Sequence, residues 1–293
     1  MPGVTKRRLA QRCAVLVAAG AAAIGVRPAK GVGRGAWAPP QKWLAFYGQL
    51  AEEAAFSGYD LIVLDPMFQG DTVRIGAGGA RLCAYLSLGE VRRGDAAFDR
   101  LDPACLLNQN PAWPDTWRVD VRHAAWRNFI LREKLPSIQA RGFTGLMLDT
   151  LDTPPWLELL QPAVFAGMRQ AAVALVQAIR DACPGILMIV NRGYAILPQL
   201  RQSIDAVLAE SLLTSPDANG GFCWNPPGDV QAQLALLAPC RDAMPPLPIL
   251  SLDYWDPADT TGMRAIYRRQ RALGHWPYVA TSNLGVIVPE PSC

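Results

Sequence analysis

Three short, mostly apolar runs in this sequence each end at a carboxylic acid. The acids are Asp149, Glu210 and Asp253, and the residues before each of them are Leu, Ile, Val, Met, Ala or Ser. Such runs are typical of buried strands, and the carboxyl ends of parallel strands meet at one edge of their sheet. We therefore expect these acids to gather at one mouth, where carboxylates can transfer protons or attack an electrophilic carbon.

Other chemistries lack the residues that they need. The two histidines, His123 and His275, are too few for a polyhistidine metal site, and we expect structural or surface roles for both. No Gly-x-Ser-x-Gly elbow is present. Lys42 precedes the first predicted strand and Lys134 lies in a predicted helix, so no strand end offers the amine of a Schiff base. We therefore predict no metal and no cofactor.

Asp149 and Glu210 suit the two-carboxylate chemistry of glycoside hydrolysis. In that reaction one carboxyl group protonates the leaving oxygen, while the other attacks the anomeric carbon or activates water. The two acids end predicted strands that flank a third strand, so both can face one bond. Asp152 and Asp256 each lie just before prolines, where helix capping competes with catalysis for Asp152 and is the better interpretation for Asp256.

Aromatic residues are concentrated near the same strand ends. They are Tyr47, Tyr85, Trp126, Trp156, Tyr194, Trp224, Tyr254 and Trp255. Sugar rings stack on aromatic faces, although most aromatic residues in a domain of this size pack in its core. We expect Trp224 and Trp255 to be exceptions, and we include Trp224, Tyr85 and Tyr254 among the candidate substrate-binding residues.

Strand-like runs alternate with helical patterns, which predicts an α/β fold with a parallel sheet. Strands are expected near residues 44–48, 61–65, 82–88, 117–121, 145–150, 186–191, 206–210 and 248–254. Helices are expected over residues 124–140, 164–182, 230–238 and 260–273. Eight strands in this pattern predict a (β/α)8 TIM barrel, which needs about 250 residues. Residues 66–81 and 91–116 show little helical period, so we expect one irregular side and a ninth short strand near residues 278–284.

The first 33 residues differ from the rest of the chain. Lys6, Arg7 and Arg8 precede an alanine-rich apolar stretch, residues 14–26, that is too short for a stable membrane span. We interpret residues 1–33 as an export signal of the Sec or twin-arginine type, with an uncleaved anchor as the alternative. Residues 40–293 then form one barrel domain, which is periplasmic or secreted and has no membrane span in its mature form.

Charge and cysteine content restrict the partners. Residues 1–42 hold eight of the 28 Lys and Arg residues and no acid, so 20 basic residues face 25 acidic ones in the remainder. This balance argues against a nucleic-acid partner, and we expect a monomer. Six cysteines remain beyond Cys13 without a Cys-x-x-Cys pair; we name no disulfide and expect Cys83 to be a small core residue.

Three motifs occur in order along the chain: YLSLGE at residues 85–90, WRVDVR at residues 117–122 and GLMLDTLD at residues 145–152. With these motifs the sequence resembles the endo-α-1,4-polygalactosaminidase family, glycoside hydrolase family 114, from about Trp43 to Leu284. The resemblance implies a barrel-fold endo-hydrolase that cleaves α-1,4-linked galactosamine or N-acetylgalactosamine polysaccharide, with retention of configuration.

The resemblance also implies roles for individual residues. By position, Asp149 corresponds to the nucleophile and Glu210 to the acid/base. The residues that it places along the cleft are Tyr85, Glu90, Asp152, Asn191 and Asp253. Arg192 stands where many relatives have glycine, and a guanidinium group near the mouth suits a polycation poorly. Two alternatives stay open: a non-catalytic carbohydrate-binding barrel and a hydrolase of another glycan.

Overall fold

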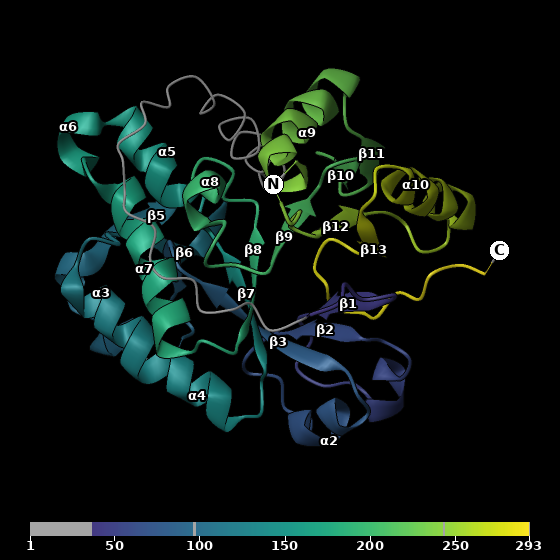
Figure 1. Cartoon of the computed structure of the whole chain (residues 1–293), viewed down its shortest axis with the longest axis horizontal. Coiled ribbons are helices and arrows are strands. Elements are labelled where there is room, and N and C mark those ends of the chain that lie inside the picture. Colours follow the sequence, from purple (N-terminus) through teal and green to yellow (C-terminus); the bar gives the residue numbers. More distant parts are fainter. Residues whose placement is uncertain (1–36, 96–97, 243, 293) are drawn as a thin grey trace.

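The structure is a computed structural model that describes residues 37–95, 98–242 and 244–292. The predicted export signal, residues 1–33, lies outside the described residues. Eight parallel strands form the central sheet (Figure 1). In spatial order they are β1 (Trp43–Phe46), β2 (Leu61–Leu64), β3 (Arg81–Ser87), β7 (Gly145–Asp149), β8 (Leu187–Asn191), β9 (Ala206–Glu210), β12 (Ile249–Tyr254) and β13 (Trp276–Ala280).

The last strand of the sheet returns to the first. Trp43 on β1 donates a hydrogen bond from Nε1 to the Trp276 carbonyl on β13 over 2.8 Å, and its ring packs on Tyr278 with centroids 5.5 Å apart. The sheet is therefore a nearly closed TIM barrel, which confirms the predicted fold class. Inside it, Cys83 is a fully buried core residue, as expected, and a side chain at Gly145 would clash with its sulfur.

One predicted barrel strand is wrong. Residues 113–119 form β6 (Trp113–Val119), which pairs antiparallel with β4 (Glu90–Arg92) and β5 (Leu106–Asn110) in a separate small sheet. Only the last two residues of β6 are buried, whereas the barrel strands β1, β2 and β8 are buried along their whole length. The eighth barrel strand is instead β13, which overlaps the short strand predicted near residues 278–284 and pairs parallel with β12.

The helices cover the outside of the barrel (Figure 1). They are α2 (Thr72–Ala77), α3 (Ala124–Phe129), a π-helical segment (Ile130–Lys134), α4 (Leu135–Ala140), α5 (Thr153–Leu160), α6 (Pro162–Phe165), α7 (Met168–Ala182), α8 (Leu197–Leu200), α9 (Pro227–Arg241) and α10 (Thr260–Ala272). Short 3-10 turns lie at Glu53–Phe56, Phe98–Arg100 and Pro103–Cys105, and β10 (Thr214–Pro216) and β11 (Phe222–Trp224) form a hairpin after β9.

One stretch in the described part of the chain, Pro162–Ala182, is long and apolar enough to cross a membrane by composition, with a mean hydropathy of 1.3. Gly167, at φ +85°, separates it into α6 and α7. Met168, Ala172, Val176 and Ile179 are buried at a spacing of three or four residues, which is the pattern of a helix that packs one face on a core. This stretch accordingly consists of two helices of the barrel's outer layer, of which α7 packs one face on the core.

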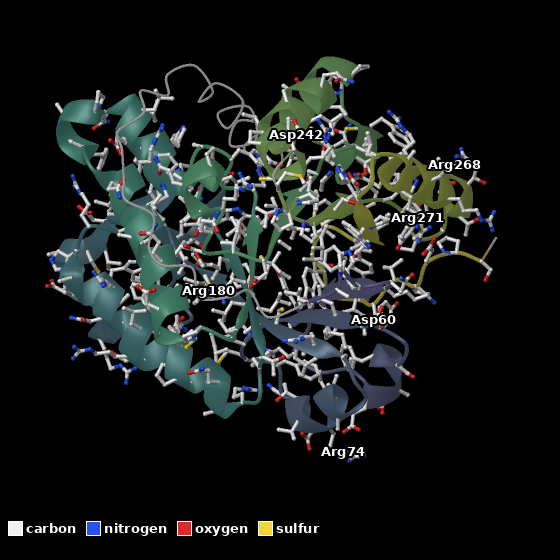
Figure 2. The ribbon with its side chains drawn as sticks, in the orientation of Figure 1. Asp60, Arg74, Arg180, Asp242, Arg268 and Arg271 are labelled. Atoms are coloured by element: carbon white, nitrogen blue, oxygen red, sulfur yellow. The ribbon has the colours of Figure 1, made fainter. Side chains whose placement is uncertain are left out.

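Arg180, labelled in Figure 2, fastens α7 to the beginnings of β8 and β9. Its guanidinium donates to Asp205 Oδ2 over 2.6 Å and to the Ile186 carbonyl over 2.7 Å. Charge-assisted bonds in this fork geometry are strong and directional. They hold the two strands in register at one end, while their other ends carry polar residues of the site described next.

Candidate active site

Four neighbouring strands each end in a polar residue. Asp149 ends β7, Asn191 ends β8, Glu210 ends β9 and Tyr254 ends β12. These strands are adjacent and parallel in the sheet, so their last residues lie around one mouth. The structure thus brings together the two acids that the sequence predicts as catalytic.

A chain of hydrogen bonds joins the two carboxylates. Tyr85 Oη donates to Asp149 Oδ2 over 2.9 Å, and Tyr254 Oη donates to Glu210 Oε1 over 2.6 Å. Asn191 Nδ2 donates to Asp149 Oδ1 over 2.9 Å and to Glu210 Oε2 over 2.7 Å. Because the last two bonds share one nitrogen, those carboxylate oxygens are no further apart than the two lengths together, about 5.6 Å.

The backbone turns sharply just beyond this group. Thr150, Arg192 and Ser211 have φ values of 61°, 55° and 54°, in the left-handed region, and each directly follows a residue of the hydrogen-bonded chain. Non-glycine residues reach this region at a cost of about 1–2 kcal/mol each. Thr150 Oγ1 offsets part of that cost by accepting a hydrogen bond from the Gly89 N–H over 2.7 Å. Strained residues of this kind cluster at functional sites.

Burial and repulsion by Glu210 set the charge state of Asp149. Burial first and then the neighbouring Glu210 charge raise the pKa of Asp149, hydrogen bonds from Tyr85 and Asn191 lower it, and together these effects bring it to about 6. A carboxylate with this pKa is ionised at neutral pH and protonated in mild acid. At neutral pH Asp149 is therefore in the ionised form that a nucleophile needs.

Tyr47 belongs to the site, although the sequence analysis gives it no role there beyond its position among the aromatic residues. Its ring packs edge-on against Tyr85 with centroids 5.2 Å apart. Its pKa is raised first by burial and then by the charges of Asp149 and Glu210, which means that it lies within electrostatic reach of both. Tyr47 follows β1 directly, as the acids end their strands, and that position is the signal that could have identified it.

Asp152 and Arg192 form an ion pair beside the two acids. Arg192 Nε donates to Asp152 Oδ2 over 3.1 Å, and only 12% of the arginine side chain is exposed. The guanidinium carbon lies 5.6 Å from the centroid of the Tyr194 ring, whose hydroxyl donates to Gln233 Oε1 over 3.1 Å. Burial raises the pKa of Asp152, and the Arg192 charge lowers it.

Three other predicted site residues lie apart from the hydrogen-bonded chain. Glu90 is buried and accepts hydrogen bonds from Asn110 Nδ2 and Thr153 Oγ1. Trp224 lies on the β10–β11 hairpin, half exposed against Trp255, and Arg269 covers its ring from a distance of 4.9 Å.

Asp253 is buried below the mouth. Its Oδ1 accepts the backbone N–H groups of Leu213 and Thr214 over 2.8 and 2.9 Å, and its Oδ2 accepts Gln270 Nε2 over 2.5 Å. Protein donors thus occupy both oxygens, and the side chain holds the loop that follows Glu210.

We expect Asp253→Ala to lower the free energy of unfolding by about 3 kcal/mol, because it leaves three buried donors without an acceptor. Urea denaturation at pH 7 measures this loss. Asp242→Ala is the matched control, because Asp242, which is labelled in Figure 2, is an exposed acid that accepts a hydrogen bond from Arg241. We expect it to change stability by less than about 0.5 kcal/mol. Equal effects of the two substitutions would contradict this anchoring role.

Two carboxylates that can face one bond are what glycoside hydrolysis requires. Residues 27–292 match the sequence profile of glycoside-hydrolase family GH114. The chain belongs to this family, and its barrel is that of a glycoside hydrolase.

Solved structures and one relative agree with this placement. The glycoside hydrolase domain of PelA from Pseudomonas aeruginosa is 27% identical, with a TM-score of 0.76 over 86% of this chain and 99% of that one. Aspergillus fumigatus Ega3, solved in complex with galactosamine, has a TM-score of 0.65 at 13% identity, over 87% of this chain and 98% of that one, and shares the fold. An uncharacterized protein from Deinococcus radiodurans is 27% identical over 268 residues, which are 85% of this chain and 82% of the relative.

Proposed function

We propose that this protein is an endo-acting hydrolase of α-1,4-linked galactosamine or N-acetylgalactosamine polysaccharide, with Asp149 as nucleophile and Glu210 as acid/base. The single observation that carries the proposal is the Asn191 bridge between the two carboxylates that end β7 and β9. The family and the galactosamine bound to the Ega3 barrel support the substrate class.

The separation of the acids supports retention of configuration. Retaining glycosidases hold their carboxyl groups about 5–5.5 Å apart, whereas inverting enzymes leave about 6.5–9.5 Å for a water molecule. An upper limit of about 5.6 Å between Asp149 Oδ1 and Glu210 Oε2 supports direct attack by Asp149 on the anomeric carbon. Glu210 then gives its proton to the leaving oxygen and later takes one from water.

Release of reducing ends from α-1,4-linked galactosaminan of mixed acetylation tests the proposal, with the anomer of the first product read by NMR. We expect cleavage to internal oligosaccharides with an α product. Binding without cleavage would favour a carbohydrate-binding barrel instead, and cleavage of a different glycan alone would assign another substrate. A β product at first appearance would overturn the retaining mechanism.

Asn191→Ala is expected to shift the acid limb of activity. Asp149 must be ionised to attack, so kcat/KM should fall below about pH 6, the pKa of its carboxyl group. The Asn191 hydrogen bond lowers that pKa, and its removal therefore moves the limb to higher pH, with about a tenfold loss of kcat/KM at pH 6. A pH profile measures both effects. Asn128→Ala, at an exposed position on α3, is the control, and an unmoved limb in Asn191→Ala would contradict this role.

The export signal, the absence of a stable membrane span in the mature form and the monomeric state remain our proposals. The apolar N-terminal pattern after Lys6, Arg7 and Arg8 supports export to the periplasm or the medium. Cell fractionation and gel filtration of the mature protein measure location and size. Retention of the full-length chain in the membrane fraction would favour an anchor.

A further inference from the structure

The Asp152–Arg192 ion pair changes the charge that a sugar meets at the mouth. Residues that could neutralise an ammonium group on the β7–β8–β9 side are the carboxylates of Asp149, Asp152 and Glu210. In the proposed reaction Asp149 is consumed by bond formation and Glu210 carries a proton. Arg192 already neutralises Asp152 over 3.1 Å. This side of the site therefore has no spare anion.

Other acids near the mouth do not fill that gap. Glu90 is buried, and its oxygens accept hydrogen bonds from Asn110 and Thr153. Asp65 follows β2 and lies within electrostatic reach of Tyr47, on the β1–β2 side of the barrel. Burying an ammonium group beside a guanidinium group without an anion is costly.

Arg192 is held rigidly, and it offers donors. The Tyr194 ring and Asp152 fix the guanidinium group, and Gln233 holds the Tyr194 hydroxyl in turn. Within the described residues, only Nε of Arg192 has a hydrogen-bond acceptor, so the two terminal nitrogens offer N–H groups. Guanidinium N–H groups have no acceptor capacity and pair with carbonyl or hydroxyl oxygens.

The backbone conformation of Arg192 is consistent with a functional role for its side chain. Arg192 adopts φ +55°, a conformation that glycine reaches without cost, and yet it carries a long charged side chain that is mostly buried. Strain of this kind persists where the surrounding contacts over-determine it.

Building on the proposed function, we infer that Arg192 is a specificity-determining residue: the sugar bound beside the Asp152–Arg192 pair is N-acetylated, and the guanidinium group donates to its acetamido carbonyl. An acetamido group is neutral and presents an oxygen acceptor, whereas the free amine of galactosamine is a cation with donors only. The pair thus selects acetylated over deacetylated polymer at this position.

Two polymers of one linkage test the inference: fully N-acetylated and fully de-N-acetylated α-1,4-galactosaminan. We expect the wild-type protein to show a kcat/KM at least about tenfold higher on the acetylated polymer, the scale of one hydrogen bond to a charged group. In Arg192→Gly the ratio of kcat/KM on the acetylated polymer to kcat/KM on the deacetylated polymer should fall about tenfold. The value on the acetylated polymer should decrease, and the value on the deacetylated polymer should increase. Glycine adopts φ +55° freely, so this variant should fold.

Further variants separate charge from hydrogen bonding. Arg192→Gln keeps N–H donors without the charge, so it should retain activity on the acetylated polymer and gain on the other. When Arg192→Gly is combined with Asp152→Asn, kcat/KM on the deacetylated polymer should no longer rise, because the Asp152 carboxylate that would bind the ammonium group is absent. Arg268→Ala removes a positive charge from the outer side of α10, where Figure 2 labels it, and should leave the ratio unchanged.

The outcomes distinguish this inference from the proposed function. Cleavage of both polymers with no preference, a wild-type preference for the deacetylated polymer, or an unchanged ratio in Arg192→Gly overturns the role of Arg192 and leaves the galactosaminidase proposal standing. Cleavage of neither polymer overturns both.

Discussion

Asp149→Asn is expected to abolish turnover while leaving a folded protein. Removal of a nucleophile costs about 10⁴-fold or more in kcat, because the amide cannot form the glycosyl ester. The asparagine side chain fits the site: its oxygen can accept the bond from Asn191 Nδ2, and its amide can donate to the Tyr85 hydroxyl. Reducing-end release and circular dichroism measure activity and folding together. A folded variant with wild-type activity would remove Asp149 from the mechanism.

The same substitution should stabilise the protein at neutral pH. The pKa of Asp149 in the folded protein, about 6, lies above its ordinary value of 3.8, so the fold binds this proton more tightly than the unfolded chain does. The ionised carboxylate therefore destabilises the fold above pH 6, and this penalty disappears below about pH 4. Two pKa units correspond to at most about 3 kcal/mol, and with partial solvent exposure we expect a gain of about 1–2 kcal/mol.

Urea denaturation at pH 8 and at pH 4 measures this gain. It should be present at pH 8 and absent at pH 4. Asp99→Asn, at an exposed acid on a 3-10 turn, is the control and should show no gain at either pH. A gain that is equal at both pH values would contradict linkage to this carboxyl group.

Glu210→Gln is expected to lower kcat on the polymer by about 10³-fold, within the range for loss of a general acid/base. The loss should depend on the leaving group. An aryl glycoside with an acidic phenol leaves without a proton, so glycosylation of Asp149 should proceed, and the covalent intermediate should accumulate because water lacks its base. The glutamine side chain can keep the bonds to Asn191 and the Tyr254 hydroxyl.

Azide separates a catalytic from a structural role for Glu210. Azide needs no general base, so it should react with the accumulated intermediate and release an α-glycosyl azide from the variant. Burst kinetics and product NMR detect both steps. Loss of activity that is the same for every leaving group, with no effect of azide, would show that Glu210 does not act as the acid/base.

The sequence predicts the barrel and the meeting of Asp149 and Glu210, our proposed catalytic pair, because both depend on local patterns. Buried parallel strands are continuous apolar runs, and Asp149 and Glu210 interrupt such runs at their ends. The wrong prediction of a barrel strand at residues 117–121 has a related cause, the pattern of apolar and polar residues. Trp117 to Val121 alternates apolar and polar residues, which is typical of a strand with one buried face, and β6 indeed pairs in a small antiparallel sheet.

The rest of the site depends on contacts that no local pattern encodes. The Asn191 bridge needs the register of β8 between β7 and β9, and the acceptor role of Asp253 needs the loop after β9 to fold back onto it. The left-handed turns at Thr150, Arg192 and Ser211 involve residue types with no preference for that conformation.

Those three turns have a consequence for how such an enzyme can diversify. Each turn directly follows Asp149, Asn191 or Glu210. The orientation of these three side chains is therefore set by the barrel strands that they end and not by the loops. Loop tips beyond the residues that pack against the site, such as the tip of the β10–β11 hairpin, can change in sequence or length without disturbing these side chains. Mutational scanning should therefore show little tolerance at the buried residues that follow these strands, such as Leu151, Leu212 and Leu213, and more tolerance at the exposed tip of the β10–β11 hairpin, residues 218–220.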